Sequence, residues 1–248
     1  MRLPNKTFYA SLLIYNFLTQ GIQAQPMEKD SLAAHSAYAT ALRQYHAWLA
    51  PETGLYRGVQ YIKYTDKLKE GHPYFEDNRM QKGTVLYNGV LYEDLSLIYD
   101  LVKDLLVISD PYNTNLVALI SGQVDRFTLG SHLFIRLSDS IHPSAPHNGF
   151  YEELYSGRTT LLKKEIKTIG KEESMEDGIQ KRIVSATSWY LKKGGVYYDA
   201  GTKKNLLNAL KDRKKEAKKF IRDNGLNIQK DPDNSLPQVL AWYDGFNH

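Results

Sequence analysis

Residues 82–100 read KGTVLYNGVLYEDLSLIYD, and this stretch decides the fold class. Residues 85–87 and 90–92 are apolar or aromatic, and only Asn88 and Gly89 separate them. Asn-Gly is the strongest short-range signal for a β-hairpin, because both residues tolerate the positive φ angles of a tight two-residue turn. The stretch therefore predicts two neighbouring antiparallel strands.

Further short apolar runs, separated by turn residues, extend from this hairpin towards the C-terminus. They cover residues 94–99, 105–108, 116–120, 124–129, 133–137, 150–155, 160–166, 183–191 and 196–198. Most of the links are too short for a parallel crossover, so we expect an antiparallel meander. The charged stretch from Lys171 to Gly178 has little to bury and is expected to be a mobile loop.

About ten strands joined in this way must curl or pack against a cover. We therefore expect an α+β fold, mainly β, in which the meander forms an open barrel or a strongly twisted sheet. The expected cover is an N-terminal amphipathic helix at residues 31–49, where Ala34, Tyr38, Ala41, Tyr45 and Trp48 recur at helical spacing.

The first 24 residues have the three-part layout of a cleavable signal peptide. Arg2 and Lys6 precede an apolar stretch at 8–18, which is too short to span a bilayer, and residues 21–24 are mostly small. A helix packed on the domain is the alternative interpretation. The chain has no cysteine, which excludes disulfides, thiolate metal sites and a lipid-acceptor cysteine. We expect an exported protein, periplasmic or peripherally attached to the envelope, without a transmembrane span after cleavage.

The C-terminal segment is helical in pattern and strongly basic. Residues 202–222 contain nine Lys or Arg against only Asp212 and Glu216, and a short final helix is expected at 236–243. Clustered cations near an anionic surface gain binding energy that salt weakens. The candidate docking residues are Lys211, Arg213, Lys214, Lys215, Lys218, Lys219 and Arg222. A solvated outer face of a packing helix would have the same pattern.

The predicted organisation is thus a signal peptide at 1–24, a helix with an antiparallel β domain at 25–200, and a basic helical segment at 201–248. The formal net charge is only +4, and export removes the usual nucleic-acid partner, so nucleic acid is not an expected ligand. No catalytic residues and no cofactor are predicted, because nucleophile elbows, glycine-rich phosphate loops and HExxH motifs are absent from the sequence.

Histidines and carboxylates offer weaker candidates for chemistry. His142 and His147 are close in sequence, and Pro143 and Pro146 between them stiffen the loop, so a metal site there is one interpretation. His132 is expected on half-exposed sheet surface. Glu152 and Glu153 are adjacent on one strand and should point to opposite faces unless the strand bulges, so they are interpreted as turn-edge carboxylates rather than as an acid/base pair.

Several longer stretches carry a resemblance to a protein family. They are GHPYF at 71–75, KGTVLYNGVLYEDLSLIYD at 82–100, VDRFTLGSHLFIRL at 124–137, GFYEELYSG at 149–157 and LLNALKDRKKEAKKFIRDNGL at 206–226. Together they resemble a family of exported proteins common in Bacteroidetes that has no assigned activity. The resemblance implies an envelope setting and makes the basic helix a family feature, but it transfers no catalytic residue.

The sequence therefore leads to three functional hypotheses. The first is a non-catalytic accessory or interaction protein that docks on an envelope protein or an anionic membrane surface. The second is a periplasmic carrier that binds a lipid or other apolar ligand in the open sheet. The third is a cell-wall or glycan hydrolase, which would need two carboxylates or a metal converging in one cleft.

Overall fold

The computed structural model describes residues 54–65, 68, 71–110, 114–138, 146–175 and 178–246. They all belong to one compact unit, Leu49–His248. The signal peptide at 1–24, the helix at 31–49 and His142 lie outside the described residues, so these expectations stay predictions.

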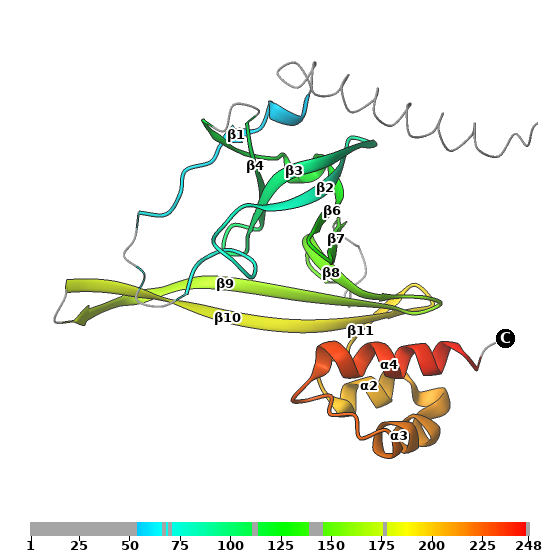
Figure 1. The fold of residues 1–248 in the computed structure, drawn as a ribbon. Helices are drawn as coiled ribbons and strands as arrows, with labels where there is room; N and C mark the ends of the chain where they lie inside the picture. The colour runs from blue at the N-terminus through cyan, green and yellow to red at the C-terminus, as the bar shows by residue number, and fades with distance from the viewer. Residues whose placement is uncertain are drawn as a thin grey trace, which may run out of the picture. The chain divides into compact units, whose positions relative to one another are not determined.

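Eleven antiparallel strands form a single sheet in the described part of the chain (Figure 1). They are β1 Val59–Gln60, β2 Gln81–Tyr87, β3 Val90–Asp100, β4 Leu105–Ser109, β5 Leu116–Ala118, β6 Val124–Leu129, β7 His132–Leu137, β8 Gly149–Ser156, β9 Thr160–Met175, β10 Gly178–Lys193 and β11 Val196–Asp199. Their spatial order is β1-β5-β4-β3-β2-β6-β7-β8-β9-β10-β11. Most neighbours are consecutive in sequence, which confirms a mainly antiparallel β fold, but the sheet is not closed.

The hairpin predicted from residues 82–100 is present between β2 and β3. Asn88 has φ of 50° and Gly89 has φ of 74°, as a two-residue turn with two positive φ angles requires. The pairing shifts between Gly83 and Val85, because β3 carries an extra residue near Asp94, which has φ of 56°. The runs expected as separate strands at 90–92 and 94–99 are therefore one strand with a bulge.

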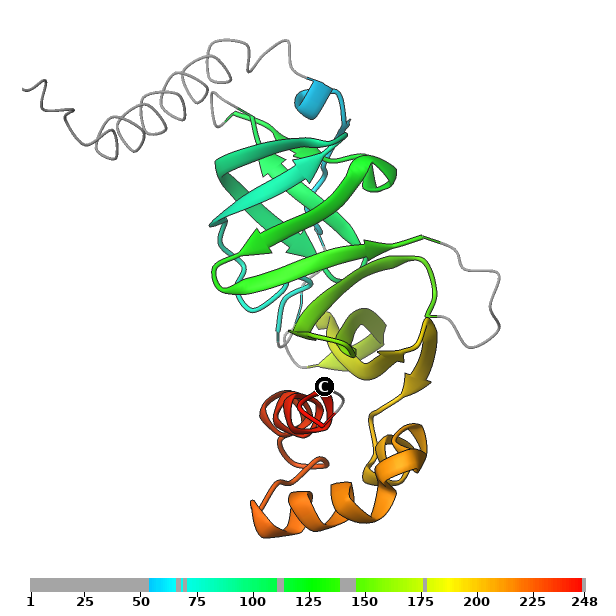
Figure 2. The same cartoon turned by 90° about the vertical axis from the view of Figure 1, so that its right-hand side faces the viewer.

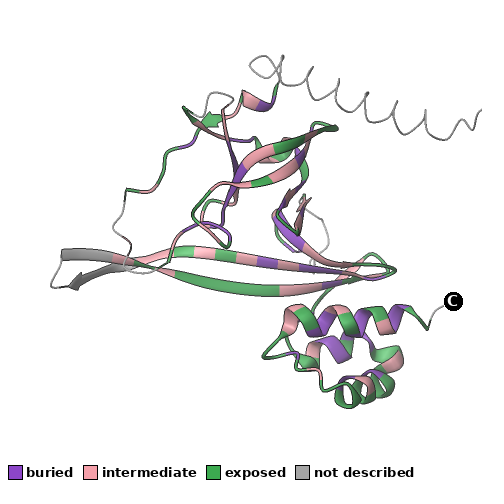
Figure 3. Cartoon of the chain, in the orientation of Figure 1, coloured by how far each residue is buried: buried purple, intermediate pink, exposed green. Residues whose placement is uncertain are grey.

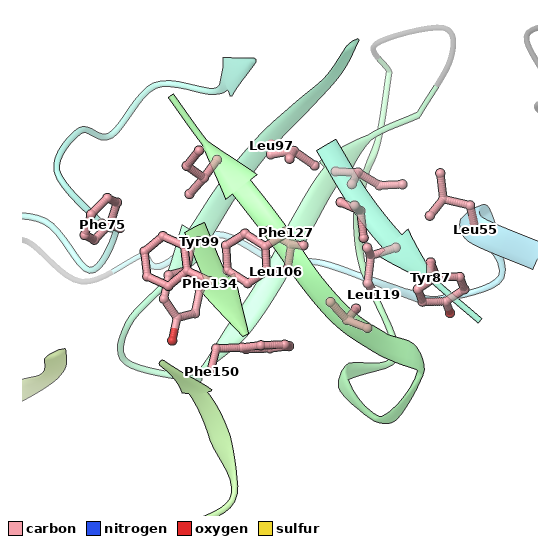
Figure 4. Close-up of a cluster of buried hydrophobic side chains, with 14 of the residues drawn as sticks. Leu55, Phe75, Tyr87, Leu97, Tyr99, Leu106, Leu119, Phe127, Phe134 and Phe150 are labelled. Atoms are coloured by element: carbon pink, nitrogen blue, oxygen red, sulfur yellow. The ribbon is translucent and has the colours of Figure 1, made fainter. Parts of the chain in front are cut away.

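Aromatic side chains fill the inner side of the sheet. Phe127 lies at the centre, with its ring centroid 4.7 Å from that of Phe134, 5.2 Å from that of Phe150 and 5.3 Å from that of Tyr99. Figure 4 shows these rings side by side, with Leu97 and other buried apolar side chains around them. The twist of the strands, visible in Figure 2, wraps β2, β3, β6 and β7 around this cluster. The protein's own side chains thus occupy the interior.

The hairpin of β9 and β10 is much longer than its neighbours. Main-chain pairing runs from Thr160 opposite Lys192 to Met175 opposite Gly178. The prediction of a loop is therefore wrong for residues 171–175 and Gly178, which lie in strands, and residues 176–177 lie outside the described part of the chain. Ladder hydrogen bonds satisfy the backbone on their own, so pairing continues where the sequence shows few apolar residues.

Three α-helices follow the sheet. They are α2 Lys203–Ala209, α3 Lys214–Asp223 and α4 Pro232–Asp244, with a 3-10 turn at Lys211–Arg213 between α2 and α3. The single helix expected at 202–222 is broken at Leu210, which has φ of −96° and ψ of 36° and is fully buried. The break lets both helices turn apolar side chains into one core. The last helix begins at Pro232, earlier than the expected 236.

The helices share their core with the long hairpin. Leu161 of β9 and Leu191 of β10 are fully buried in one cluster with Leu206, Leu236 and Leu240. Figure 3 shows buried residues on the inner sides of the helices and exposed residues on their outer sides. Asp244 at the end of α4 adds a polar anchor, because its Oδ2 accepts a hydrogen bond of 2.9 Å from the Thr159 backbone N–H. The basic C-terminal segment is thus packed on the sheet.

Candidate functional site

The cations of α3 form one exposed face. Lys215, Lys218, Lys219 and Arg222 are exposed and follow one another at i, i+3, i+4 and i+7, which places them on one side of a helix. On the opposite side, Ala217 and Ile221 are buried among the other helices. We call Lys215, Lys218, Lys219 and Arg222 the basic face.

The other three candidate residues border this face and are partly engaged. Lys214 donates to Asn208 Oδ1 over 3.0 Å, and the guanidinium of Arg213 lies 5.0 Å from the ring centroid of Phe246. Lys211 is exposed in the turn before α3. The structure therefore brings all seven predicted docking residues to the same short helix and the turn before it.

Few carboxylates of the described chain neutralise the basic face. Arg222 pairs with Asp223 at 2.9 Å, and both side chains are exposed. Within residues 54–246, as far as they are described, no ion pair is present for Lys215, Lys218 or Lys219. The positive charge of these three lysines is therefore available to a partner.

The turn before α3 is held by a second polar anchor. Asp212 accepts from Lys193 Nζ at 2.6 Å and from the Tyr243 hydroxyl at 2.6 Å. Burial opposes ionisation of Asp212, but the hydrogen bonds from Lys193 and Tyr243 outweigh it and lower the pKa of this carboxyl. Asp212, one of the two acids expected to offset the lysines, is thus directed towards the sheet.

A small hollow of about 240 Å³ lies beside the basic face, between α3 and α4. Lys219 borders it together with Phe220, Trp242, Glu216 and Asp223. The rings of Phe220 and Trp242 stack at a centroid distance of 4.9 Å. Aromatic rings, a cation and two carboxylates line this hollow, so the surface on one side of the basic face is partly apolar and carries charges of both signs.

A partly buried polar network, which the sequence analysis missed, joins the sheet to α4. His132 Nδ1 lies 2.5 Å from Glu152 Oε1, and its Nε2 lies 3.1 Å from Glu76 Oε1. Lys163 Nζ lies 3.5 Å from Glu152 Oε2 and donates to Asp233 Oδ2 over 2.6 Å. Because Lys163 contacts both carboxylates, its single positive charge offsets part of their negative charge.

The register of the strands explains this network. Phe134, Glu152, Lys163 and Trp189 are direct cross-strand partners on β7, β8, β9 and β10. The Trp189 indole donates to Asp233 Oδ1 over 2.7 Å. Burial alone would lower the pKa of Lys163, but the bond to Asp233 and the charge of Glu152 raise it above its usual value.

Two interpretations of single residues change with this geometry. His132 is half-buried as expected, yet it shares a strand face with the buried Phe134, so it belongs to the core side of β7. Glu152 is only 6% exposed, lies in the middle of β8 and forms ion pairs, so the turn-edge interpretation is wrong for it. The sequence did not reveal this position because the cross-strand partners of Glu152 are distant along the chain.

The described residues do not form a cluster suited to a metal ion. Across these residues there is no group of three or more His, Asp or Glu side chains placed to hold one. Of the two histidines at 142 and 147, only His147 lies within the described residues, and its backbone carbonyl accepts a 2.7 Å hydrogen bond from the Tyr151 hydroxyl.

Comparisons with known proteins add no assignment. No protein-family model, no curated protein and no solved structure matches the chain. The resemblance to exported proteins of Bacteroidetes therefore stays a prediction. Among the helices of the described residues, none has the length and apolar character needed to cross a bilayer.

Proposed function

We propose that the protein is a non-catalytic interaction protein that docks through the basic face of α3 on an anionic surface of the cell envelope. One observation carries the proposal. Lys215, Lys218 and Lys219 are presented together on a packed helix, without ion pairs to other described residues. A fixed cluster of cations gains more from an anionic partner than the same charges spread along a mobile tail, because less conformational freedom is lost on binding.

The packing of the sheet favours docking over carriage of a ligand inside it. Phe127, Phe134 and Phe150 are at most 3% exposed and contact one another across the interior. A carrier that holds a lipid inside its sheet would need that space for the ligand. Docking through the basic face requires no empty space inside the sheet.

The polar network supports a structural role for its carboxylates. A glycosidase needs two carboxyl groups that face an open cleft. Glu152 is buried, and both it and Asp233 contact Lys163. The envelope setting in this proposal comes from the predicted signal peptide and from the resemblance stated above.

A matched pair of triple variants tests the proposal. The first variant is Lys215→Glu, Lys218→Glu and Lys219→Glu. The control is Lys203→Glu, Lys204→Glu and Lys230→Glu, which changes the net charge equally at exposed positions of the same helical segment. Both variants are expressed as the full chain, and circular dichroism checks that they fold.

The readout is the fraction of protein that sediments with the envelope fraction at increasing salt. We expect the wild-type chain and the control to sediment at low salt and to be released as salt screens the interaction. The first variant should remain in the supernatant at all salt concentrations. Equal sedimentation of the two triple variants would exclude the basic face as the docking site.

A further inference from the structure

A second hollow lies at the β1 edge of the sheet, far along the chain from the basic face. Its volume is about 540 Å³, within the range of small-molecule sites. Its apolar lining includes Leu105 of β4, Leu119, Val59, Ile62 and Ile120, and we call the exposed Val59, Ile62 and Ile120 its rim.

Exposed apolar side chains are concentrated at this rim. Val59 is 73% exposed, Ile62 is 72% exposed and Ile120 is 44% exposed. They are three of the nine large apolar side chains that the described residues leave exposed, and the two most exposed of all are among them. Scattered apolar residues are ordinary on a protein surface, whereas a cluster around a concave site indicates a ligand or partner.

The hollow contains one cation, Lys103. Its ammonium group lies 4.3 Å from the ring centroid of Tyr64 and 4.7 Å from that of Tyr61, and it donates to the Ile62 carbonyl over 3.3 Å. Within the described chain, Lys103 forms no ion pair with a carboxylate. Its ammonium group is therefore contacted by two rings and a carbonyl, and no carboxylate of the described chain lies within ion-pair distance of it.

The nearby buried carboxylate of Asp100 is already satisfied by neutral donors. It accepts from the Tyr61 hydroxyl at 2.8 Å and the Tyr64 hydroxyl at 2.9 Å, and from the backbone N–H groups of Val102 at 2.9 Å and Lys103 at 3.0 Å. Burial, followed by the hydrogen bond to Asp100, raises the pKa of Tyr64, so this hydroxyl stays protonated as a donor. Asp100 thus fixes both tyrosine rings without needing the Lys103 ammonium.

We propose that this hollow binds a single-chain amphiphile with an anionic head, such as a long-chain carboxylate. Charge complementarity places the head at Lys103 Nζ, and the alkyl chain lies along Val59, Ile62, Leu105 and Ile120. An amphiphile with a cationic head would be repelled by Lys103. The site is separate from the filled interior of the sheet and from the basic face, so it goes beyond the docking function proposed above.

Three probes separate the contributions of head and chain: dodecanoate, dodecanol with the same chain but a neutral head, and acetate with the head alone. Each is titrated into the full-length protein, dodecanoate below its critical micelle concentration and dodecanol below its solubility limit. Calorimetry and amide chemical shifts are the readouts. We expect dodecanoate to bind with one-to-one stoichiometry, about fivefold more tightly than dodecanol, with shifts centred on Ile62, Lys103 and Ile120. Acetate should not saturate the site.

Variants of the exposed rim then locate the site without disturbing the core. Lys103→Gln should reduce dodecanoate affinity about fivefold and leave dodecanol affinity unchanged, and Lys103→Arg should restore dodecanoate binding. Val59→Ser with Ile62→Ser should weaken both alkyl ligands about tenfold. The matched control is Ile166→Ser with Val184→Ser, two apolar residues exposed elsewhere, on β9 and β10.

Each alternative outcome would overturn the proposal. If Lys103→Gln binds dodecanoate as tightly as the wild type, the hollow does not select an anionic head. If the control at Ile166 and Val184 weakens binding as much as the rim variant, the ligand attaches to exposed apolar surface in general. Absence of saturable dodecanoate binding, or loss of it in the triple glutamate variant of α3, would reject this site as well.

Discussion

Lys163 on β9 donates to Asp233 on α4 over 2.6 Å, and the same ammonium group lies 3.5 Å from the buried carboxylate of Glu152. One side chain thereby links the helices to the sheet and compensates a carboxylate that is 6% exposed. Removing one member of a partly buried network is costly, because the charge left behind is neither hydrated nor paired.

We therefore expect Lys163→Met to lower the free energy of unfolding by about 2–3 kcal/mol. Urea denaturation followed by circular dichroism measures the change. The control is Lys82→Met, which removes an exposed pair with Asp94 and should cost less than about 1 kcal/mol. Similar losses in the two variants would show that Lys163 contributes no more than a surface cation.

Gly149 permits the close approach of a second ion pair. It has φ of 143°, and a Cβ atom there would lie 2.2 Å from Asp104 Oδ2 and 2.8 Å from Lys164 Nζ. We expect Gly149→Ala to destabilise the protein by about 2 kcal/mol or more, because it strains the backbone and displaces the pair of Asp104 and Lys164.

Gly122→Ala is the comparison for that measurement, since a Cβ atom at Gly122 would meet no heavy atom within 4 Å and its backbone is not in the left-handed region. Its thermal midpoint should stay near the wild-type value. A normal midpoint for Gly149→Ala would contradict the contact geometry.

The carboxyl group of Asp110 should titrate unusually low. The Thr114 hydroxyl and backbone N–H each donate to it over 2.7 Å, with further donors from Asn115, and these bonds lower its pKa from 3.8 to about 2. A depressed folded-state pKa stabilises the protein above the unfolded value of 3.8. This contribution is lost as the pH falls through about 2.

Thr114→Val removes the hydroxyl donor and should move the titration of Asp110 upwards, towards 3.8. Carbon-detected NMR of the Asp110 carboxyl, followed from neutral pH down to the lowest pH at which the chain stays folded, measures the shift. The pKa of Asp77, which hydrogen bonds from Arg79 lower, provides an internal control that should not change in this variant. An unchanged Asp110 midpoint would show that the hydroxyl bond does not hold the charge.

The shared core predicts that helices and sheet unfold together. Leu236 of α4 is fully buried in a cluster with Leu161 and Leu191 of the long hairpin. Leu236→Ala should cost about 2–5 kcal/mol, through lost burial and the cavity left behind. The helical and strand signals in infrared spectroscopy should shift to the same lower midpoint. Loss of the helical signal alone would mean that the helices form a separate cooperative unit.

The strands could be predicted because their signals are local. The Asn88-Gly89 turn and the alternation around it are contained within a few residues, and the structure places a hairpin there. The break at Leu210 could not be foreseen in the same way. Leucine, lysine and arginine are all good helix formers, so only the position of the surrounding core decides where the helix stops.

The polar network was hidden for a different physical reason. Glu152 contacts His132 from 20 positions away, and Lys163 reaches Asp233 across 70 positions. Such contacts depend on strand register and helix docking, which alternation within one strand does not specify. The seven basic residues, by contrast, are close in sequence and lie on one helix and its preceding turn, so their proximity followed from the sequence alone.

The order of the strands also has a consequence for how the chain reaches its native state. Hairpins such as β6–β7 and β9–β10 join strands that are adjacent in sequence, so each can form early at little cost in chain entropy. The β2–β6 ladder, however, brings together strands separated by the whole of β3, β4 and β5. We expect formation of the β2–β6 ladder to be the rate-limiting step of folding. Substitutions in this ladder should therefore slow refolding, while substitutions in the β9–β10 hairpin should chiefly accelerate unfolding.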